Sequence, residues 1–173
     1  MIAQLKSLKK EVEETKNYKE WKEKNPNSYF VSAFFLGDKF YSKSKEWQFD
    51  FYEADKDKVV SFIYGKDEPV KEEEIFKKTK DKLGELVLED IKFDLDKAIF
   101  TFEKIKSAKH PSETATKKLF ILQVLEGKPV WNITYISSSF NILNIKIDAI
   151  SGEVVSESFS SVLSFKDKEL SKG

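Results

Sequence analysis

Carboxylates and a single histidine are the residues of this sequence that could do chemistry. The chain has 30 acidic residues, and two carboxylates held in a cleft in different environments could act as general acid and base. His110 stands alone, so a two-histidine metal site is excluded and the remaining role is that of a lone base. Because His110 precedes Pro111 in a polar stretch, we expect it in a surface connector. The acidic runs, such as Glu72–Glu74, lie among lysines, which is typical of solvated faces.

Motifs for cofactor or metal binding are missing from the sequence. It contains no GxGxxG and no GxxxxGK(S/T) segment, and its six glycines all stand singly. It has no cysteine, which excludes a thiolate nucleophile, a disulfide framework and a cysteine-based metal site. We therefore expect no cofactor, no metal and no catalytic residues.

Three large aromatic side chains are the candidates for a binding surface. Trp47 and Trp131, together with Tyr135, could line a concave face on which a ligand or a peptide settles. Alternatively, they fill the space between a helix and a sheet, because the alternation through residues 47–51 and 131–135 puts the aromatic rings of each segment on one side. The sequence favours the core and leaves both interpretations open.

The balance of charge narrows the range of partners. With 30 basic and 30 acidic residues, the chain has no global field that would attract nucleic acid or an anionic membrane. No window approaches the roughly 20 apolar residues that a membrane span needs. Residues 1–12 lack the apolar core of a signal peptide. Together with the absence of cysteine, this predicts a cytoplasmic protein, and an exported or anchored parent that has lost its signal is the alternative.

The first half of the chain has the pattern of a helix followed by strands. Apolar residues at helical spacing predict a helix over residues 3–24, which Asn25 and Pro26 end. The nearly continuous apolar run 29–36 predicts a strand that is covered on both faces. Residues 47–51 and 59–64 predict a hairpin that completes a meander.

The second half repeats this order. Asp94 is the predicted N-cap of a helix that reaches about residue 107. The apolar run 119–125 predicts a second buried strand, the alternation over 131–135 predicts the next, and residues 144–156 predict a closing hairpin. We expect an antiparallel meander over residues 118–163.

These patterns predict an α+β fold made of two similar helix-plus-antiparallel-sheet units in tandem. The first unit covers residues 1–66 and the second covers residues 93–173. The highly charged residues 67–92 between them are interpreted as a linker, with a short helical or edge-strand piece around residues 75–76.

An internal repeat supports this division. Moving residues 29–37 forward by 90 positions places them on residues 119–127, with the two terminal glycines matched. A shift of 95 places residues 53–61 on residues 148–156. The difference predicts an additional strand or a longer hairpin in the second unit, around residues 131–140.

The second unit resembles the PepSY family. The resemblance covers residues 93–163 and rests on the helix after Asp94, on the Gly127–Trp131 entry to an alternating strand, and on the Ile147–Val154 segment with its Ser-Gly-Glu turn. It implies a cystatin-like helix against a curved antiparallel sheet. It also implies a domain without catalysis that restrains peptidases or acts as a sensing or binding module.

The sequence therefore predicts a non-catalytic binding or regulatory protein with a protein or peptide partner. One alternative is a carrier of a small apolar ligand in a pocket between helix and sheet. A second is an enzyme that works through carboxylates or through His110, which would need two facing carboxylates in a cleft.

Overall fold

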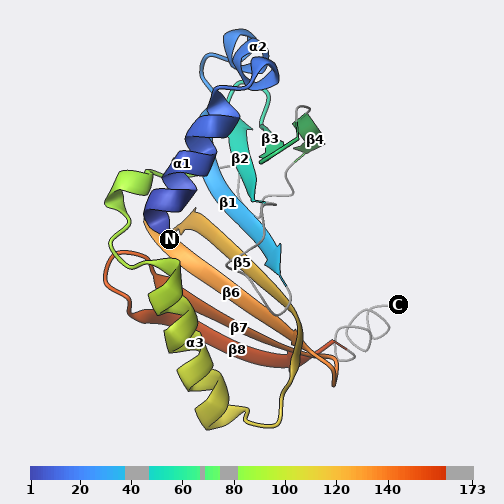
Figure 1. The fold of residues 1–173 in the computed structure, drawn as a ribbon, viewed down its shortest axis with the longest axis vertical. Helices are drawn as coiled ribbons and strands as arrows, with labels where there is room; N and C mark the ends of the chain where they lie inside the picture. Colours follow the sequence, from blue (N-terminus) through green and yellow to red (C-terminus); the bar gives the residue numbers. More distant parts are fainter. Residues whose placement is uncertain (38–46, 67–68, 75–81, 163–173) are drawn as a thin grey trace.

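The fold is α+β, as the sequence predicts, with helices against one antiparallel sheet (Figure 1). The computed structural model describes residues 1–37, 47–66, 69–74 and 82–162, and only the backbone of residues 69–74. The helices are α1 (Ile2–Glu13), α2 (Lys16–Lys24) and α3 (Leu95–Lys109), with a 3₁₀ turn at Leu88–Asp90. The strands are β1 (Tyr29–Gly37), β2 (Gln48–Glu53), β3 (Lys58–Ile63), β4 (Pro69–Glu74), β5 (Ala115–Leu125), β6 (Lys128–Ser137), β7 (Asn141–Asp148) and β8 (Val154–Ser161).

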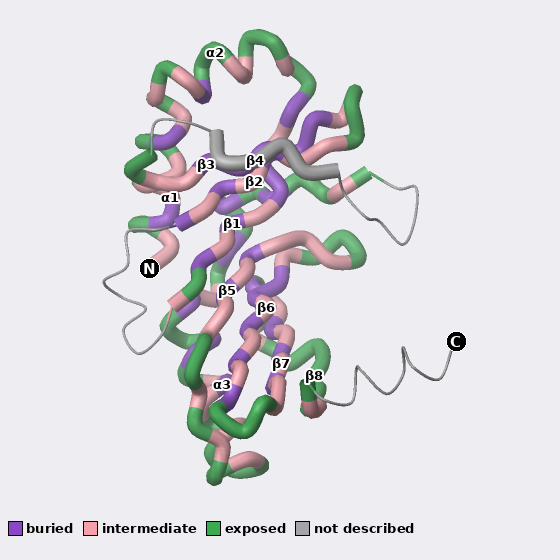
Figure 2. Tube along the Cα trace, turned by 90° about the vertical axis from the view of Figure 1, so that its right-hand side faces the viewer, coloured by how far each residue is buried: buried purple, intermediate pink, exposed green. Residues whose placement is uncertain are grey.

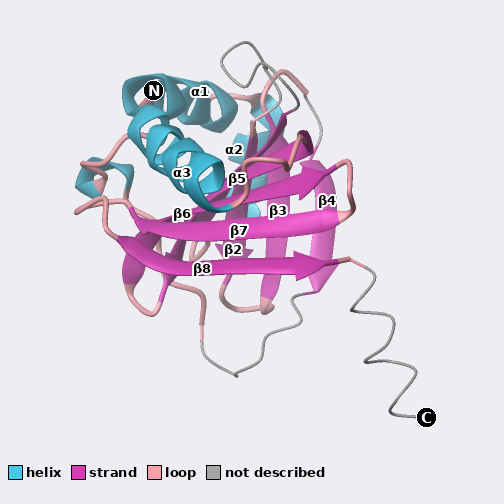
Figure 3. Ribbon diagram, turned by 90° about the horizontal axis from the view of Figure 1, so that it is seen from below, coloured by secondary structure: helices cyan, strands magenta, loops and turns pink. Residues whose placement is uncertain are grey.

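The strands form an 8-stranded sheet in the order β4-β3-β2-β1-β5-β6-β7-β8, with antiparallel pairing throughout. Each half of the chain contributes a meander, and the meanders join where β1 pairs with β5, for example at Phe34 and Ile121. Helices α1 and α3 lie on the same face of the sheet (Figure 1). Seen from below, β6, β7 and β8 cross in front of β2, β3 and β4, so the sheet is strongly twisted (Figure 3).

One row of side chains on the helix side of the sheet shows how the two halves are packed. Along the ladders, each residue of this row lies opposite the next: Phe62, Phe49, Ala33, Leu122, Trp131 and Ile147. All of these side chains are buried, and they belong to one cluster with buried residues of all three helices. Burial of this face is the main source of stability, and both halves share it.

The N-terminal helical segment is divided, although the sequence predicts one helix over residues 3–24. Thr15 makes the break between α1 and α2: its Oγ1 donates to the carbonyl of Val12 at 2.7 Å and accepts from the amide of Tyr18 at 3.3 Å. A threonine side chain that bonds its own backbone competes with a continuous helix and caps a new one. The predicted N-cap Asp94 of α3 is confirmed.

The interpretation of residues 67–92 as a linker is wrong in two respects. The segment contains strand β4, which extends the first meander by pairing with β3. It also contributes Leu86 and Leu88 to the core, where the amide of Leu86 donates to the carbonyl of Phe30 at 2.8 Å. Many charged residues surround Leu86 and Leu88 in the sequence, so no apolar pattern there predicts their burial. The piece predicted around residues 75–76 lies outside the described residues.

The structure also changes the alignment of the two halves. β4 gives the first meander a fourth strand, so the additional strand predicted around residues 131–140 of the second unit is not needed. The turn that contains Ala54 joins β2 to β3, whereas the turn that contains Ala149 joins β7 to β8. These turns occupy different places in their meanders when β1 is matched with β5. The sequence match at Ala54 and Ala149 is therefore a coincidence.

Candidate functional site

Strand β8 forms one edge of the sheet and is exposed along most of its length (Figure 2). Within the described residues, β7 pairs with one side of β8 and no strand pairs with the other. Most exposed large hydrophobic side chains of the described residues lie on β8 or next to it: Phe140, Ile150, Val154, Val155, Phe159 and Val162. The others, Leu36, Val87 and Phe100, are scattered over other elements. Apolar surface therefore gathers at this edge.

The two edge strands, β4 and β8, differ in the residues that protect an edge against pairing with another chain. An edge strand offers unpaired backbone groups to other chains, and proline, lysine and dense charge are the usual protection against such pairing. β4 has this protection, because its sequence contains Pro69, Lys71 and the acidic run Glu72–Glu74. β8 has the sequence VVSESFSS, with Glu157 as its one charged residue. Among the described residues, the edge at β8 therefore lacks the protection that β4 has.

Two contacts from the end of α3 hold β8 in place. The Lys109 ammonium donates to Glu157 Oε2 at 2.6 Å, and the His110 ring stacks on the Phe159 ring with centroids 4.0 Å apart. At the end of the strand, the Val162 amide donates to the Phe140 carbonyl. A strand fixed in this way loses little conformational freedom when another segment pairs with it.

The turn before β8 is built around the carboxylate of Asp148. Its Oδ1 accepts from the amides of Ile150 and Ser151, at 2.8 and 2.9 Å. These bonds, with the one from Ser151 contributing most, lower the pKa of Asp148 below its usual value. The ionised Asp148 carboxylate therefore stabilises the folded state above the pKa that this group has in the unfolded chain. That stabilisation is lost as the pH falls through the lowered pKa of Asp148 in the folded chain.

A cavity of about 380 Å³ lies at the beginning of β8, and we call it the β8 hollow. Its walls come from Leu125 and Lys128 at the β5–β6 hairpin, from Val130 and Lys146 in the strands, and from Val154–Ser156 of β8. Val130 is buried, whereas Val154 and Val155 are 44% and 56% exposed. The lining of the hollow therefore combines apolar side chains with five charged ones, Glu126, Lys128, Lys146, Asp148 and Glu153.

The three aromatic candidates of the sequence do not form a surface. Trp47, Trp131 and Tyr135 are 4%, 0% and 4% exposed and belong to the core on the helix side of the sheet. Trp131 Nε1 donates to the Phe93 carbonyl at 2.8 Å, and Tyr135 Oη donates to Glu103 Oε1 at 2.5 Å. The sequence left two interpretations of these aromatic side chains open, and in the structure they are part of the core.

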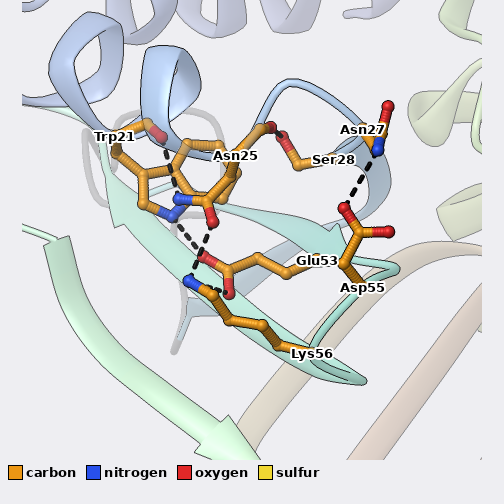
Figure 4. Close-up of polar contacts among 7 residues, drawn as sticks. All are labelled: Trp21, Asn25, Asn27, Ser28, Glu53, Asp55 and Lys56. Carbon is orange, nitrogen blue, oxygen red and sulfur yellow. Dashed lines mark hydrogen bonds and ion pairs between the residues drawn. The ribbon is translucent and has the colours of Figure 1, made fainter.

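Among the described residues, the most buried carboxylate is that of Glu53, which is 2% exposed. Its Oε1 accepts from Trp21 Nε1 at 2.6 Å, and its Oε2 lies 3.2 Å from the Lys56 ammonium, which also donates to Asn25 Oδ1 (Figure 4). The cluster fastens α2 to the β2–β3 turn. Among the described residues, no group of three or more His, Asp or Glu side chains could hold a metal ion.

Replacing Trp21 by phenylalanine should lower the free energy of unfolding by about 1–3 kcal/mol, because Glu53 Oε1 loses its donor while remaining buried. The phenylalanine keeps an aromatic ring against Phe51 and Phe62. Urea denaturation measures the change. Adding Glu53→Gln to the variant should recover part of the loss, since a neutral amide is cheaper to bury; independent, additive effects would contradict the coupling.

The sequence reasoning missed β8 as a candidate site, although a signal was present. No basic residue occurs between Lys146 and Lys166 in a chain with 30 of them, so the strand lacks the usual edge protection. That signal acquires meaning once β8 is known to be an edge. No described helix is long and apolar enough to cross a membrane.

Comparison with known proteins yields no family. No family model matches the chain, and no curated protein matches it. Among solved structures, it is similar to a proposed lipoprotein from Clostridium difficile 630, with a TM-score of 0.49 and 14% sequence identity over 82% of this chain and 89% of that chain.

Proposed function

We propose that this protein is a non-catalytic binding module that holds an extended segment of a partner protein against β8. The observation that carries the proposal is the gathering of exposed apolar side chains along an edge strand without protecting charge. In strand addition, main-chain hydrogen bonds supply affinity and alternate side chains supply specificity. The contacts of Lys109 and His110 favour this mode because they fix the edge before a partner arrives.

The test uses a library of random dodecapeptides displayed on phage and selected on the immobilised full chain. Selected peptides should bind the wild-type chain and should lose at least about tenfold in affinity for the Val155→Lys variant, because an edge lysine disfavours strand pairing. Val87→Lys is the matched control, since Val87 is also exposed and lies far along the chain from β8. Fluorescence anisotropy measures the affinities.

Hydrogen exchange on the complex separates strand addition from other binding modes. Amides of β8 should exchange more slowly when a selected peptide is bound. Peptides that bind Val155→Lys as tightly as wild type and protect amides elsewhere would refute the proposal.

We further propose that the two halves are PepSY-like units. In support, each half has a helical part followed by a four-strand meander, and the meanders meet at antiparallel strands β1 and β5, as a two-fold relation between units requires. The resemblance over residues 93–163 agrees with a regulatory binding role. A cytoplasmic location stays a prediction.

A carrier of a small ligand is the second candidate function. A cavity of about 430 Å³ lies between α1 and residues 85–89, with Phe30, Leu86 and Leu88 among its lining residues and Lys6 and Lys9 on its α1 side. Such a lining suits a small molecule with an apolar body and a polar end. Native mass spectrometry of the purified protein should reveal a co-purified small molecule if this candidate is correct, and a ligand-free mass would oppose it.

A further inference from the structure

We propose that the segment bound at β8 comes from a different protein and inserts an aromatic side chain into the β8 hollow. This inference rests on the proposed function and adds the chemistry of the partner.

The register places the hollow beside one particular position of a bound segment. Trp131 and Ile147 point to the core, so their neighbours Val130 and Lys146 point to the opposite face. Ser156 lies opposite Lys146 in the ladder and therefore belongs to the same face as Lys146. A segment paired with β8 would put alternate side chains on this face. The side chain opposite Ser156 would lie next to the hollow.

The charges around the hollow disfavour an acidic side chain. The carboxylate of Asp148 is already occupied by two amides of the turn. Two lysines, Lys128 and Lys146, and three carboxylates, those of Glu126, Asp148 and Glu153, line the hollow, so its net charge of −1 disfavours an acidic side chain. With Leu125, Val154 and Val155 in its lining and a volume of about 380 Å³, the hollow suits a large aromatic group. Aromatic side chains are also the commonest anchors of protein interfaces.

The charges on the edges disfavour a second copy of this chain as the partner. Antiparallel pairing of two β8 strands about their middle would bring the two Glu157 carboxylates together, and like charges across a ladder are destabilising. Pairing of β8 with β4 of another copy would set Glu157 against the acidic run Glu72–Glu74. A segment from another protein with a neutral or basic residue near Glu157 avoids both conflicts.

The experiment titrates N-acetyl-tryptophan amide into the ¹⁵N-labelled full chain and follows the amide chemical shifts. Shifts should concentrate at Val130, Lys146 and Val154–Ser156. The Ser156→Phe variant fills the hollow and should weaken binding about tenfold. Ser158→Phe is the matched control, because Ser158 is an exposed serine on the same face of β8 and does not line the hollow. It should bind like the wild type.

Equal binding by the wild-type and Ser156→Phe chains, or shifts that lie away from the hollow, would overturn the inference. The display experiment separates its failure from that of the proposed function. Peptides that pair with β8 but carry no aromatic residue opposite Ser156 would refute the aromatic anchor and leave strand addition intact. A dimer that forms with increasing concentration in sedimentation, and that Val155→Lys does not form, would show that the partner of β8 is a second copy of this chain and not another protein.

Discussion

Replacing Trp131 by alanine is expected to lower the free energy of unfolding by about 3–5 kcal/mol, the range for removing a large buried ring. The side chain of Trp131 is fully buried in β6, between Leu122 and Ile147 in the core row. Its truncation leaves a cavity in the face that both halves share. It also leaves the Phe93 carbonyl without the indole donor at 2.8 Å. Urea denaturation followed by circular dichroism measures the loss.

Two further variants give this experiment its controls. Trp131→Phe keeps an aromatic ring and removes the donor, so it should cost less than Trp131→Ala. Phe100→Ala removes a ring that is 73% exposed and should change stability by no more than about 0.5 kcal/mol. A Trp131→Ala chain that keeps its stability but loses binding to selected peptides would show that Trp131 serves binding and not the stability of the core.

Replacing Gly152 by alanine is expected to cost about 2–5 kcal/mol, because two separate effects add. The backbone φ of Gly152 is +80°, a left-handed conformation that costs an L-residue roughly 1–2 kcal/mol. A Cβ on Gly152 would also clash with the ring of Phe93. Overpacking of this kind costs about 1–3 kcal/mol more. Thermal and urea denaturation of the full chain measure the sum.

Gly127→Ala separates the two effects. Gly127 has nearly the same φ, +77°, but a Cβ there would meet nothing within 4 Å. It should therefore show the backbone cost alone. The double variant Gly152→Ala with Phe93→Ala should lose less stability than the sum of the losses of the two single variants, because the aromatic ring that clashes with the new Cβ is absent. Equal losses for Gly152→Ala and Gly127→Ala would mean that the Phe93 ring moves aside freely.

Much of the local structure could be predicted from the sequence because it depends on neighbours along the chain. The alternation through residues 131–135 placed Trp131 and Tyr135 on one side of a strand, and the structure buries both. Asp94 was identified as a cap from its position before a helical pattern. Thr15 was overlooked, because residues 3–24 keep helical spacing across it and spacing alone does not reveal a side chain that bonds its own backbone.

The exposed edge at β8 could not be predicted in the same way. The pattern of β8 indicated a strand, but a strand has an exposed edge or a buried one according to its neighbours in the sheet. The same holds for β4, whose charges suggested a linker until its pairing with β3 was known. A free edge is a property of the strand order, which no local pattern contains.

By itself, the sequence determined an α+β protein with helices before two meanders, a core rich in aromatic rings and no motif for a cofactor. The tertiary structure alone decided that the meanders merge through β1 and β5, where Ser32 pairs with Gln123, and that β8 is left at the open end. Periodicity and caps arise from interactions over a few residues. Pairing between strands so far apart in the chain depends on closing a long loop and on burying one common face, so it is settled only when the whole chain folds.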